Sequence, residues 1–305
     1  MVGCQLVIKL LEAGYDFKAF ISPKSIFKRP WINDIIPSDR AIRIDLRSKD
    51  LINRVISRMK NDRYTLVYIA GRMMGKNIYH VNYYGVKYLI DILGDRINRV
   101  IFISSILALG DSLGGEVISE DMIGRPATEY EWSKWDAERY IIDMAGRLGY
   151  SYAILRPVWI IGEYTINPDI ILLSKLMKIH IMPIPVRKNL PIHLIYSGDL
   201  ANAITYTLDS SKSGIYNIYG IRTTMYEFMN CLREILDIGR CIKLTIPKSV
   251  LKFGVRWMQT LRYLLLAPRE ISMDLWLKDF KYKPKTGLRE MLSKAIEWLE
   301  NMKLI

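Results

Sequence analysis

The chain has 305 residues, half of them hydrophobic and a quarter charged, so it is long enough to bury the core of one large domain or two closely fused ones. Its formal net charge of +13 suggests affinity for anions, such as phosphorylated cofactors and substrates. The Lys and Arg residues are scattered and form no recognisable nucleic-acid module, so we do not expect nucleic acid as a partner.

Cysteines, histidines and apolar runs argue against further classes of protein. Cys4, Cys231 and Cys241 form neither a disulfide pattern nor metal-ligand spacing, and the three histidines are far apart. We therefore expect no bound metal and a reducing, cytoplasmic compartment. No apolar run reaches membrane-spanning length. The apolar, aromatic and basic segment Lys248–Leu266 predicts a helix that packs over a substrate cleft or at a subunit interface, with contact to a membrane surface as the alternative.

Strand-like apolar runs alternate with helical patterns through the first half of the chain. The predicted strands cover residues 17–22, 41–45, 65–70, 99–104 and 152–156. The predicted helices cover residues 3–13, 51–59, 82–93 and 128–148. This alternation predicts an α/β fold, with a parallel sheet covered by helices on both faces.

The pattern is more mixed beyond Pro157. Helices are predicted at residues 169–178, 199–208 and 224–236 and at the C-terminus, and strands near 194 and 215–219. Thr224 and Glu227 form a capping box at the start of one of these helices. No linker or clean boundary divides the chain, so we expect a smaller lobe from Pro157 onward, with segments that return to the main sheet.

The helix predicted from Thr128 carries a candidate acid/base pair. Thr128 and Glu131 form a capping box, and Tyr130 and Lys134 then share one face of the first turns. An ammonium beside a phenol favours phenolate, so we expect the pKa of Tyr130 to be lowered. Such a Tyr can exchange protons with an alcohol or ketone near neutral pH. Taken alone, the pair is more often a partly buried Tyr and a solvated Lys on an ordinary helix.

Further motifs accompany this helix in a fixed order. They are Asp45-Leu46, Val81-Asn82 through Gly85, Val100 through Ser104-Ser105 and Gly110, Arg156-Pro157 with Gly162, and Gly198-Asp199-Leu200-Ala201. With Tyr130 and Lys134, they make the chain resemble the extended short-chain dehydrogenase/reductase superfamily, specifically the NAD-dependent epimerase/dehydratase group. The resemblance implies a Rossmann-type doubly wound parallel sheet with a smaller C-terminal substrate-binding lobe. It makes residues 1–156 the NAD(P)-binding Rossmann domain, and residues 157–305 a mixed segment that completes the sheet and forms the lobe.

The resemblance also implies the roles of individual residues. Tyr130 would be the catalytic acid/base, Lys134 would lower its pKa and hydrogen-bond the nicotinamide ribose, and Ser105 would hold the substrate oxygen. Asp45 would meet the adenine, and Asn82 would order the site. The further residues implied in cofactor binding are Gly3, Ser22, Lys24, Leu46, Ala70, Gly71, Ser104 and Pro157.

The choice between NAD and NADP stays open. An NAD enzyme usually places an acidic side chain at the end of its second strand, to hold the ribose 2′-hydroxyl. Here the strand at residues 17–22 ends without an acid and is followed by Lys24, Lys28 and Arg29. These cations favour NADP slightly, through attraction to a 2′-phosphate, unless they are merely solvated loop residues.

The start of the chain differs from the family layout. By resemblance, Met1 through Val7 aligns with the last glycine of the glycine-rich turn and the helix after it. The first strand and two of the turn's glycines would then be missing. That strand is central in the 3-2-1-4-5-6 order, and its removal opens a gap of about 10 Å between its neighbours. We expect the functional protein to carry an upstream segment, with a truncated, non-binding relative as the alternative.

The expected substrate is a nucleotide sugar, with Arg187 and Lys188 as candidates to bind its diphosphate. Ile106 and Leu107 follow Ser105 where the family's dehydratases place Asp-Glu, so we do not expect sugar dehydration. The family's usual Arg before the Asp199 motif is not clearly present. The reactions that we still expect are oxidation, reduction, or epimerisation through a ketone.

The sequence also allows two alternative functions. The aromatic segment Phe253–Trp276 would suit a reductase or dehydrogenase of an apolar alcohol or ketone, resembling the hydroxysteroid and dihydroflavonol branch. A non-catalytic cofactor-binding relative is the second alternative. The resemblance also implies a homodimer, formed through the Tyr130 helix and the helix near Tyr88.

Overall fold

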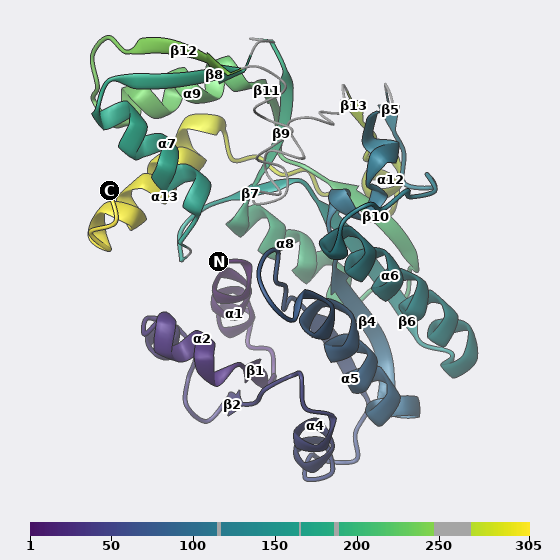
Figure 1. Ribbon diagram of the computed structural model, residues 1–305. Coiled ribbons are helices and arrows are strands. Elements are labelled where there is room, and N and C mark those ends of the chain that lie inside the picture. The colour runs from purple at the N-terminus through teal and green to yellow at the C-terminus, as the bar shows by residue number, and fades with distance from the viewer. Residues whose placement is uncertain (115–116, 165, 186–188, 247–269) are drawn as a thin grey trace.

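The computed structural model describes residues 1–114, 117–164, 166–185, 189–246 and 270–305 (Figure 1). The segment Lys248–Leu266 lies outside these residues, as do Arg187 and Lys188. Within the described ranges, no helix is both long enough and apolar enough to cross a membrane. Helices and strands alternate along the first half of the chain, which is the pattern expected from the sequence.

The elements of the first half, up to Pro157, have the following bounds. They are α1 (Val2–Glu12), β1 (Ala19–Ile21), α2 (Pro23–Lys28), α3 (Ile32–Ile35), β2 (Ala41–Arg43), α4 (Lys49–Ile56), β3 (Tyr64–Tyr68), the π-helix η1 (His80–Tyr84), α5 (Gly85–Leu93), β4 (Ile97–Ile103), β5 (Val117–Ile118), α6 (Glu129–Leu148) and β6 (Ser151–Pro157). The capping box that predicts the start of α6 is present, with Thr128 at the N-cap and Glu131 at the third position.

The elements after Pro157 include several short strands that the sequence pattern did not predict. The elements are β7 (Trp159–Ile161), α7 (Pro168–Lys178), β8 (Ile181–Pro185), β9 (Pro191–Tyr196), α8 (Ser197–Leu208), β10 (Gly214–Ile218), β11 (Ile221–Thr224), α9 (Met225–Ile235), β12 (Ile242–Ile246), β13 (Glu270–Ile271), α12 (Asp274–Phe280) and α13 (Leu288–Asn301). The capping box of Thr224 and Glu227 opens α9, as predicted.

A four-stranded parallel sheet, in the order β10-β6-β4-β3, forms the centre of the protein. Alternate residues of β4 point to its two faces. Val100 and Phe102 pack with the apolar residues of α4, α5 and α6, whereas Ile101 and Ile103 pack with those of α1 and α8. Helices therefore cover both faces of this sheet, as Figure 1 shows. Such a sheet presents the carboxyl ends of its strands along one edge, where ligands bind in open α/β folds.

The parallel strands of the first half do not form one continuous sheet. β1 and β2 pair with each other in a separate two-stranded sheet, and β3 is the last strand of the central one. Leu66 and Val67 of β3 are only partly buried, unlike the residues of β4 beside them. The division falls between β1 and β3.

The C-terminal lobe has its own apolar core. The strands β11, β9 and β7 form a three-stranded sheet, and β12 pairs with β8. Met177 of α7, Phe228 of α9 and Leu292 of α13 are fully buried within this core. β10 leaves the lobe and pairs with β6 in the central sheet.

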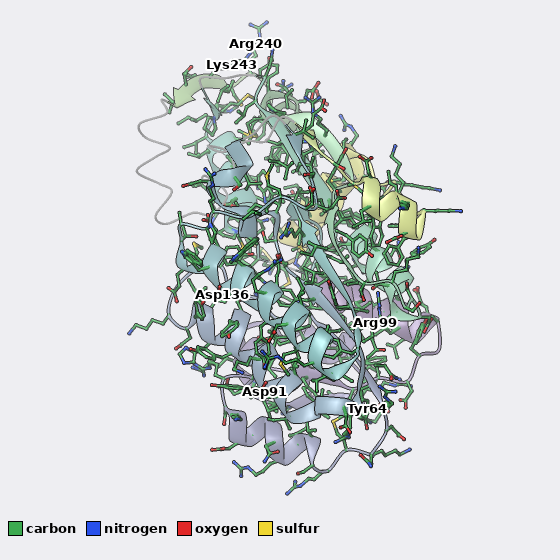
Figure 2. The ribbon with its side chains drawn as sticks, turned by 90° about the vertical axis from the view of Figure 1, so that its right-hand side faces the viewer. Tyr64, Asp91, Arg99, Asp136, Arg240 and Lys243 are labelled. Atoms are coloured by element: carbon green, nitrogen blue, oxygen red, sulfur yellow. The ribbon has the colours of Figure 1, made fainter. Side chains whose placement is uncertain are left out.

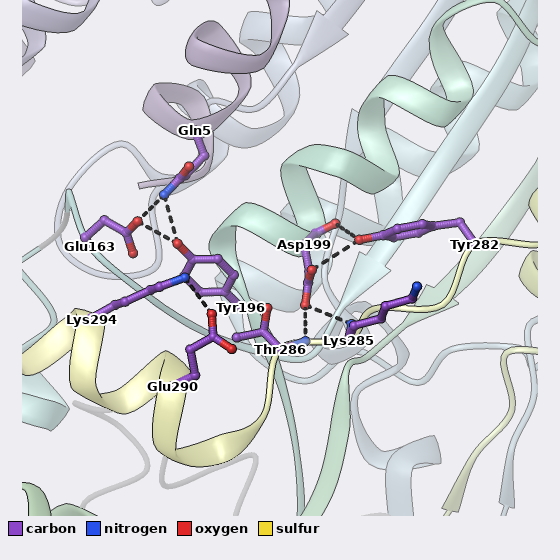
Figure 3. Close-up of polar contacts among 9 residues, drawn as sticks. All are labelled: Gln5, Glu163, Tyr196, Asp199, Tyr282, Lys285, Thr286, Glu290 and Lys294. Atoms are coloured by element: carbon purple, nitrogen blue, oxygen red, sulfur yellow. Dashed lines mark hydrogen bonds and ion pairs between the residues drawn. The ribbon is translucent and has the colours of Figure 1, made fainter. Parts of the chain in front are cut away.

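Polar contacts join the C-terminal segment to the start of α8 (Figure 3). The Asp199 carboxylate accepts hydrogen bonds from the backbone N–H groups of Lys285 and Thr286, at 3.2 and 2.9 Å. It also accepts one from the Tyr282 hydroxyl at 3.2 Å. The Asp199 motif therefore fastens the chain end to the central fold in this structure.

A second set of contacts joins α1 to the lobe. The Gln5 amide donates to Glu163 at 2.5 Å and to the Tyr196 hydroxyl at 3.3 Å, and Tyr196 donates to Glu163 at 2.6 Å. The Lys294 ammonium of α13 lies 4.6 Å from the centre of the Tyr196 ring (Figure 3). These contacts hold the first helix against residues more than 150 positions later in the chain.

Candidate active site

The site is built at the carboxyl end of β4. The strand ends at Ile103, and Ser104 and Ser105 follow it, both buried. The Ser105 hydroxyl accepts a hydrogen bond from the backbone N–H of Leu107 at 3.2 Å, which caps the short 3₁₀ helix at residues 106–109. A hydroxyl can accept and donate at the same time, so the Ser105 proton remains available for a second hydrogen bond.

Tyr130 and Lys134 face the strand end from the first two turns of α6. Their exposed fractions are 6% and 3%. The Lys134 ammonium donates to the carbonyl oxygen of Ile103 at 2.8 Å, and the Ser105 hydroxyl lies close enough to the Tyr130 phenol to lower its pKa. The structure thus brings together the three residues that the sequence analysis named as catalytic, and it places the amine inside the protein rather than in bulk water.

Burial has the largest effect on the pKa values of both Tyr130 and Lys134. It raises the pKa of Tyr130 to about 12; the Ser105 hydrogen bond lowers this pKa and the Glu131 charge raises it. Burial lowers the pKa of Lys134 to about 7, against the charge of Glu138, which raises it. The prediction that the pKa of Tyr130 is lowered is therefore wrong for the ligand-free protein. The sequence argument weighed the nearby cation, whereas the loss of hydration around the phenol is the larger influence.

Asn82 connects the loop after β3 to α6. Its side chain is fully buried, on the π-helix η1. The Asn82 amide donates to the carbonyl of Arg72 at 3.0 Å and to the Ser133 hydroxyl at 2.9 Å, and it accepts from the backbone N–H of Arg72 at 2.8 Å. Asn82 thereby fixes the loop beside the acid/base residues. A π-helical turn is rare and is often found at functional sites.

Gly71 leaves open space beside the Lys134 amine. A Cβ atom at this position would lie 3.6 Å from the Lys134 nitrogen and 4.0 Å from the Asn82 side-chain oxygen. The Gly71 residue itself is exposed. A molecule that lies along the end of β3 can therefore reach the amine without meeting a side chain at position 71.

The sequence model of the NAD-dependent epimerase/dehydratase family matches residues 1–219. The chain belongs to this family. No curated protein matches the sequence.

Solved structures of the same fold support the architecture. The chain resembles dTDP-glucose 4,6-dehydratase from Bacillus anthracis in complex with NAD, with 16% identity, a TM-score of 0.77 and coverage of 100% of this chain and 96% of that one. It also resembles UDP-glucuronic acid 4-epimerase from Bacillus cereus in complex with NAD, with 16% identity, a TM-score of 0.78 and coverage of 99% and 96%. UDP-glucose 4-epimerase from Thermotoga maritima, solved with UDP-glucose, gives 16% identity, a TM-score of 0.75 and coverage of 99% and 96%. At these identities, the likeness establishes a Rossmann-type fold with a C-terminal lobe.

Asp45 and Lys24, two of the residues expected to bind the cofactor, lie near each other. Asp45 forms an ion pair with Arg47, which lowers the pKa of Asp45, and the charge of Lys24 lowers it further. Ser22 follows the end of β1 directly. Sequence reasoning did not find Arg47 as the partner of Asp45, although its position two residues later was a usable signal.

The other named residues are distributed as follows. Leu46 and Ala70 are partly buried against the core on the α5 side of the sheet. Gly3 lies in the first turn of α1, where a Cβ atom would have nothing within 4 Å. Pro157 ends β6 at the same edge of the sheet as Ser104. The substrate candidates Arg187 and Lys188 lie outside the described residues.

No metal centre is found in the part of the chain that the structure describes, since it contains no group of three or more suitable ligands. Cys4, Cys231 and Cys241 are free.

Proposed function

We propose that this protein catalyses the NAD(P)-dependent oxidation, reduction or epimerisation of a nucleotide sugar, with Tyr130 as the acid/base. The Ser105 hydroxyl near the Tyr130 phenol, together with the Lys134 amine, carries this proposal, because all three groups are buried at the carboxyl end of β4. A hydroxyl that positions an oxygen and a phenol that exchanges its proton are what carbonyl reduction and alcohol oxidation require.

The residues present fit a nicotinamide dinucleotide. The open position at Gly71 leaves room for a sugar beside the Lys134 amine, which would donate a hydrogen bond to the nicotinamide ribose. Asp45 and Lys24 would lie at the adenosine end. The cofactor, when bound in its oxidised form, supplies the hydride acceptor and a positive charge. The structures that resemble this chain and contain NAD favour NAD, whereas Lys24 favours NADP.

The proton transfers follow from the two hydroxyl groups. Ser105 would donate a hydrogen bond to the substrate oxygen and hold it beside Tyr130. With a pKa of about 12, Tyr130 is a neutral phenol at pH 7, so it is ready to protonate a ketone oxygen as reduction proceeds. In the oxidative direction the phenolate must form, and positive charge on Lys134 and on the cofactor favours it.

Epimerisation or simple redox chemistry fits the chain better than dehydration. Ile106 and Leu107, which follow Ser105, are buried apolar side chains and offer no acid or base. The net charge of +13 suits a substrate that carries a diphosphate. Arg187 and Lys188 remain our candidates to bind that diphosphate.

The test is conversion of UDP-glucose to UDP-galactose in the presence of NAD, followed by chromatography of the nucleotide sugars. The variant Tyr130→Phe should reduce kcat by about 10²–10⁴-fold, because the acid/base is lost. NAD binding, measured by thermal shift, should remain, since the ring is kept. Unchanged turnover in this variant would refute the role of Tyr130. Reduction of an apolar aromatic ketone with NADPH, without action on UDP-glucose, would instead favour the hydroxysteroid-like alternative.

We also expect a homodimer formed through α5 and α6. Trp132 on α6 is 46% exposed. The rings of Tyr83, in the π-helix η1 directly before α5, and of Tyr140, in α6, lie 6.0 Å apart. Light scattering coupled to size-exclusion chromatography would measure the mass. The three free cysteines fit a reducing, cytoplasmic setting.

A further inference from the structure

Three polar side chains lie one turn apart along the buried face of α6. Tyr130, Lys134 and Glu138 are four residues apart, so they lie on the same side of the helix. Glu138 is fully buried, with 0% of its surface exposed. Tyr130 and Lys134 take part in the proposed proton transfers, whereas Glu138 does not. A carboxylate buried to this degree needs partners that compensate for its lost hydration.

Glu138 accepts hydrogen bonds from the ends of two neighbouring strands. Arg156 of β6 donates to it from Nε at 3.0 Å and from Nη2 at 2.6 Å, which makes a bidentate ion pair. The Ser104 hydroxyl donates to the same carboxylate at 2.5 Å. Because Ser104 directly precedes Ser105, the carboxylate joins the helix that carries Tyr130 to the strand end that carries Ser105.

Stability alone is a weak explanation for this ion pair. Arg156 and Glu138 are both fully buried, and the loss of hydration of two such charges is often as large as their attraction. Apolar residues of similar size in such positions often give equal or greater stability. What the charged pair supplies here is geometry, since it joins α6, β4 and β6 beside the acid/base residues.

We propose that Glu138 and Arg156 are positioning residues: together they hold Ser104, and through it Ser105, opposite Tyr130, and the Glu138 carboxylate favours the protonated form of the Lys134 amine one helical turn away. This rests on the proposed function of Tyr130 and Lys134. Burial lowers the pKa of Lys134 to about 7, and the Glu138 charge opposes that change. The contacts of the amine with the Ile103 carbonyl, the Phe102 ring, Gly71 and the Asn82 amide involve uncharged groups. The Tyr130 phenol, one helical turn away, is neutral at pH 7.

The test uses the full chain and two kinds of variant. Glu138→Gln keeps the shape of the side chain and removes its charge. The double variant Glu138→Leu/Arg156→Met removes both charges, so no unpaired charge is left in the interior. The matched control is Arg99→Met.

Arg99 is also a buried arginine, 2% exposed, but it donates to the Thr207 carbonyl and the Ser151 hydroxyl instead of a carboxylate. It lies near the amino end of β4, away from Ser104. In Figure 2, Arg99 and Asp136, a residue of α6, lie on opposite sides of the view. The control therefore reports the effect of losing a buried guanidinium without disturbing the site.

The first readout is the titration of Lys134 in the ligand-free protein. It is followed by NMR of ¹³C-labelled lysine and assigned with Lys134→Met. In Glu138→Gln, Lys134 should titrate at a pH lower by about one unit, because the carboxylate charge is gone. In the double variant the shift should be in the same direction and smaller, because the Arg156 charge is removed with it. The second readout is UDP-glucose turnover with NAD, which should fall about tenfold or more through kcat rather than KM, since the reacting groups are misplaced. Arg99→Met should leave both readouts as in the wild type.

Circular dichroism shows whether the variants are folded. If folded variants keep the wild-type titration midpoint of Lys134 and the wild-type turnover, the Glu138–Arg156 pair only supports the fold, and the proposal is overturned. If the double variant does not fold, Glu138→Gln decides by the same two measurements. A wild-type protein without activity on UDP-glucose would count against the proposed function alone. The Lys134 midpoint would then decide whether Glu138 controls the charge of the amine.

Discussion

Replacing Lys134 by Met should stabilise the protein while it abolishes activity. The pKa of Lys134 is about 7 in the folded protein and 10.5 in its ordinary environment. Protonating it therefore costs more in the folded state. Each pH unit between these values corresponds to about 1.4 kcal/mol, so at pH 7 the buried amine lowers the free energy of unfolding by about 4 kcal/mol. Met has a similar length and no charge, so the variant does not bear this cost.

Part of that gain is offset by contacts which only the lysine makes. The ammonium donates to the Ile103 carbonyl at 2.8 Å and lies 4.7 Å from the centre of the Phe102 ring. A hydrogen bond to a charged group contributes about 1.5–3 kcal/mol. We therefore expect Lys134→Met to raise the free energy of unfolding by about 1–3 kcal/mol at pH 7.

The pH dependence identifies the cause. Because the folded-state pKa of Lys134 is lowered, the unfolded chain binds more protons between pH 7 and 10.5, and wild-type stability rises with pH across this window. The advantage of Lys134→Met should therefore shrink by about 2 kcal/mol between pH 7 and pH 9. Urea unfolding of both proteins at several pH values measures this difference.

Lys87→Met is the matched control. Burial lowers the pKa of Lys87, but its hydrogen bonds to Asp91 and Tyr140 outweigh burial and raise it above the ordinary value. Its contribution to stability is therefore fully present below the unfolded pKa, and the difference between Lys87→Met and the wild type should stay constant from pH 7 to 9. A Lys134→Met protein that is less stable than the wild type at pH 7, or whose advantage does not change with pH, would refute the reasoning.

Two further outcomes follow from the site. Gly71→Leu should weaken NAD binding in a thermal-shift assay with little change in the melting temperature of the free protein, because the side chain fills exposed space beside the Lys134 amine; unchanged binding would place the cofactor elsewhere. Lys24→Ala should reduce affinity for NADP more than for NAD, measured by isothermal titration, and equal losses would show that Lys24 does not contact a 2′-phosphate.

Local sequence signals predicted the helices well. The capping boxes at Thr128 and Thr224 fix the starts of α6 and α9, because each box is closed by groups only three residues apart. The short strands of the lobe were missed for the opposite reason. β8 and β12 have five residues each, too few to show a period, and they pair with partners about 60 residues away.

The same distinction, between contacts close in sequence and contacts far apart in sequence, applies to the site. The spacing of Tyr130 and Lys134 is a property of one helix and could be read directly. The hydrogen bond from Asn82 to Ser133 joins residues 51 positions apart, so no local pattern predicts it. The ion pair of Arg156 with Glu138 was equally hidden, although the four-residue spacing from Lys134 to Glu138 was a signal that could have been followed.

The sequence by itself determined the alternation of strands and helices, the family, and the helix face on which phenol and amine lie, because these depend on spacing along the chain. Only the tertiary structure decided how the groups ionise. Burial of Tyr130 and Lys134 is created by residues distant in sequence, and it moves both pKa values toward the neutral forms of these side chains.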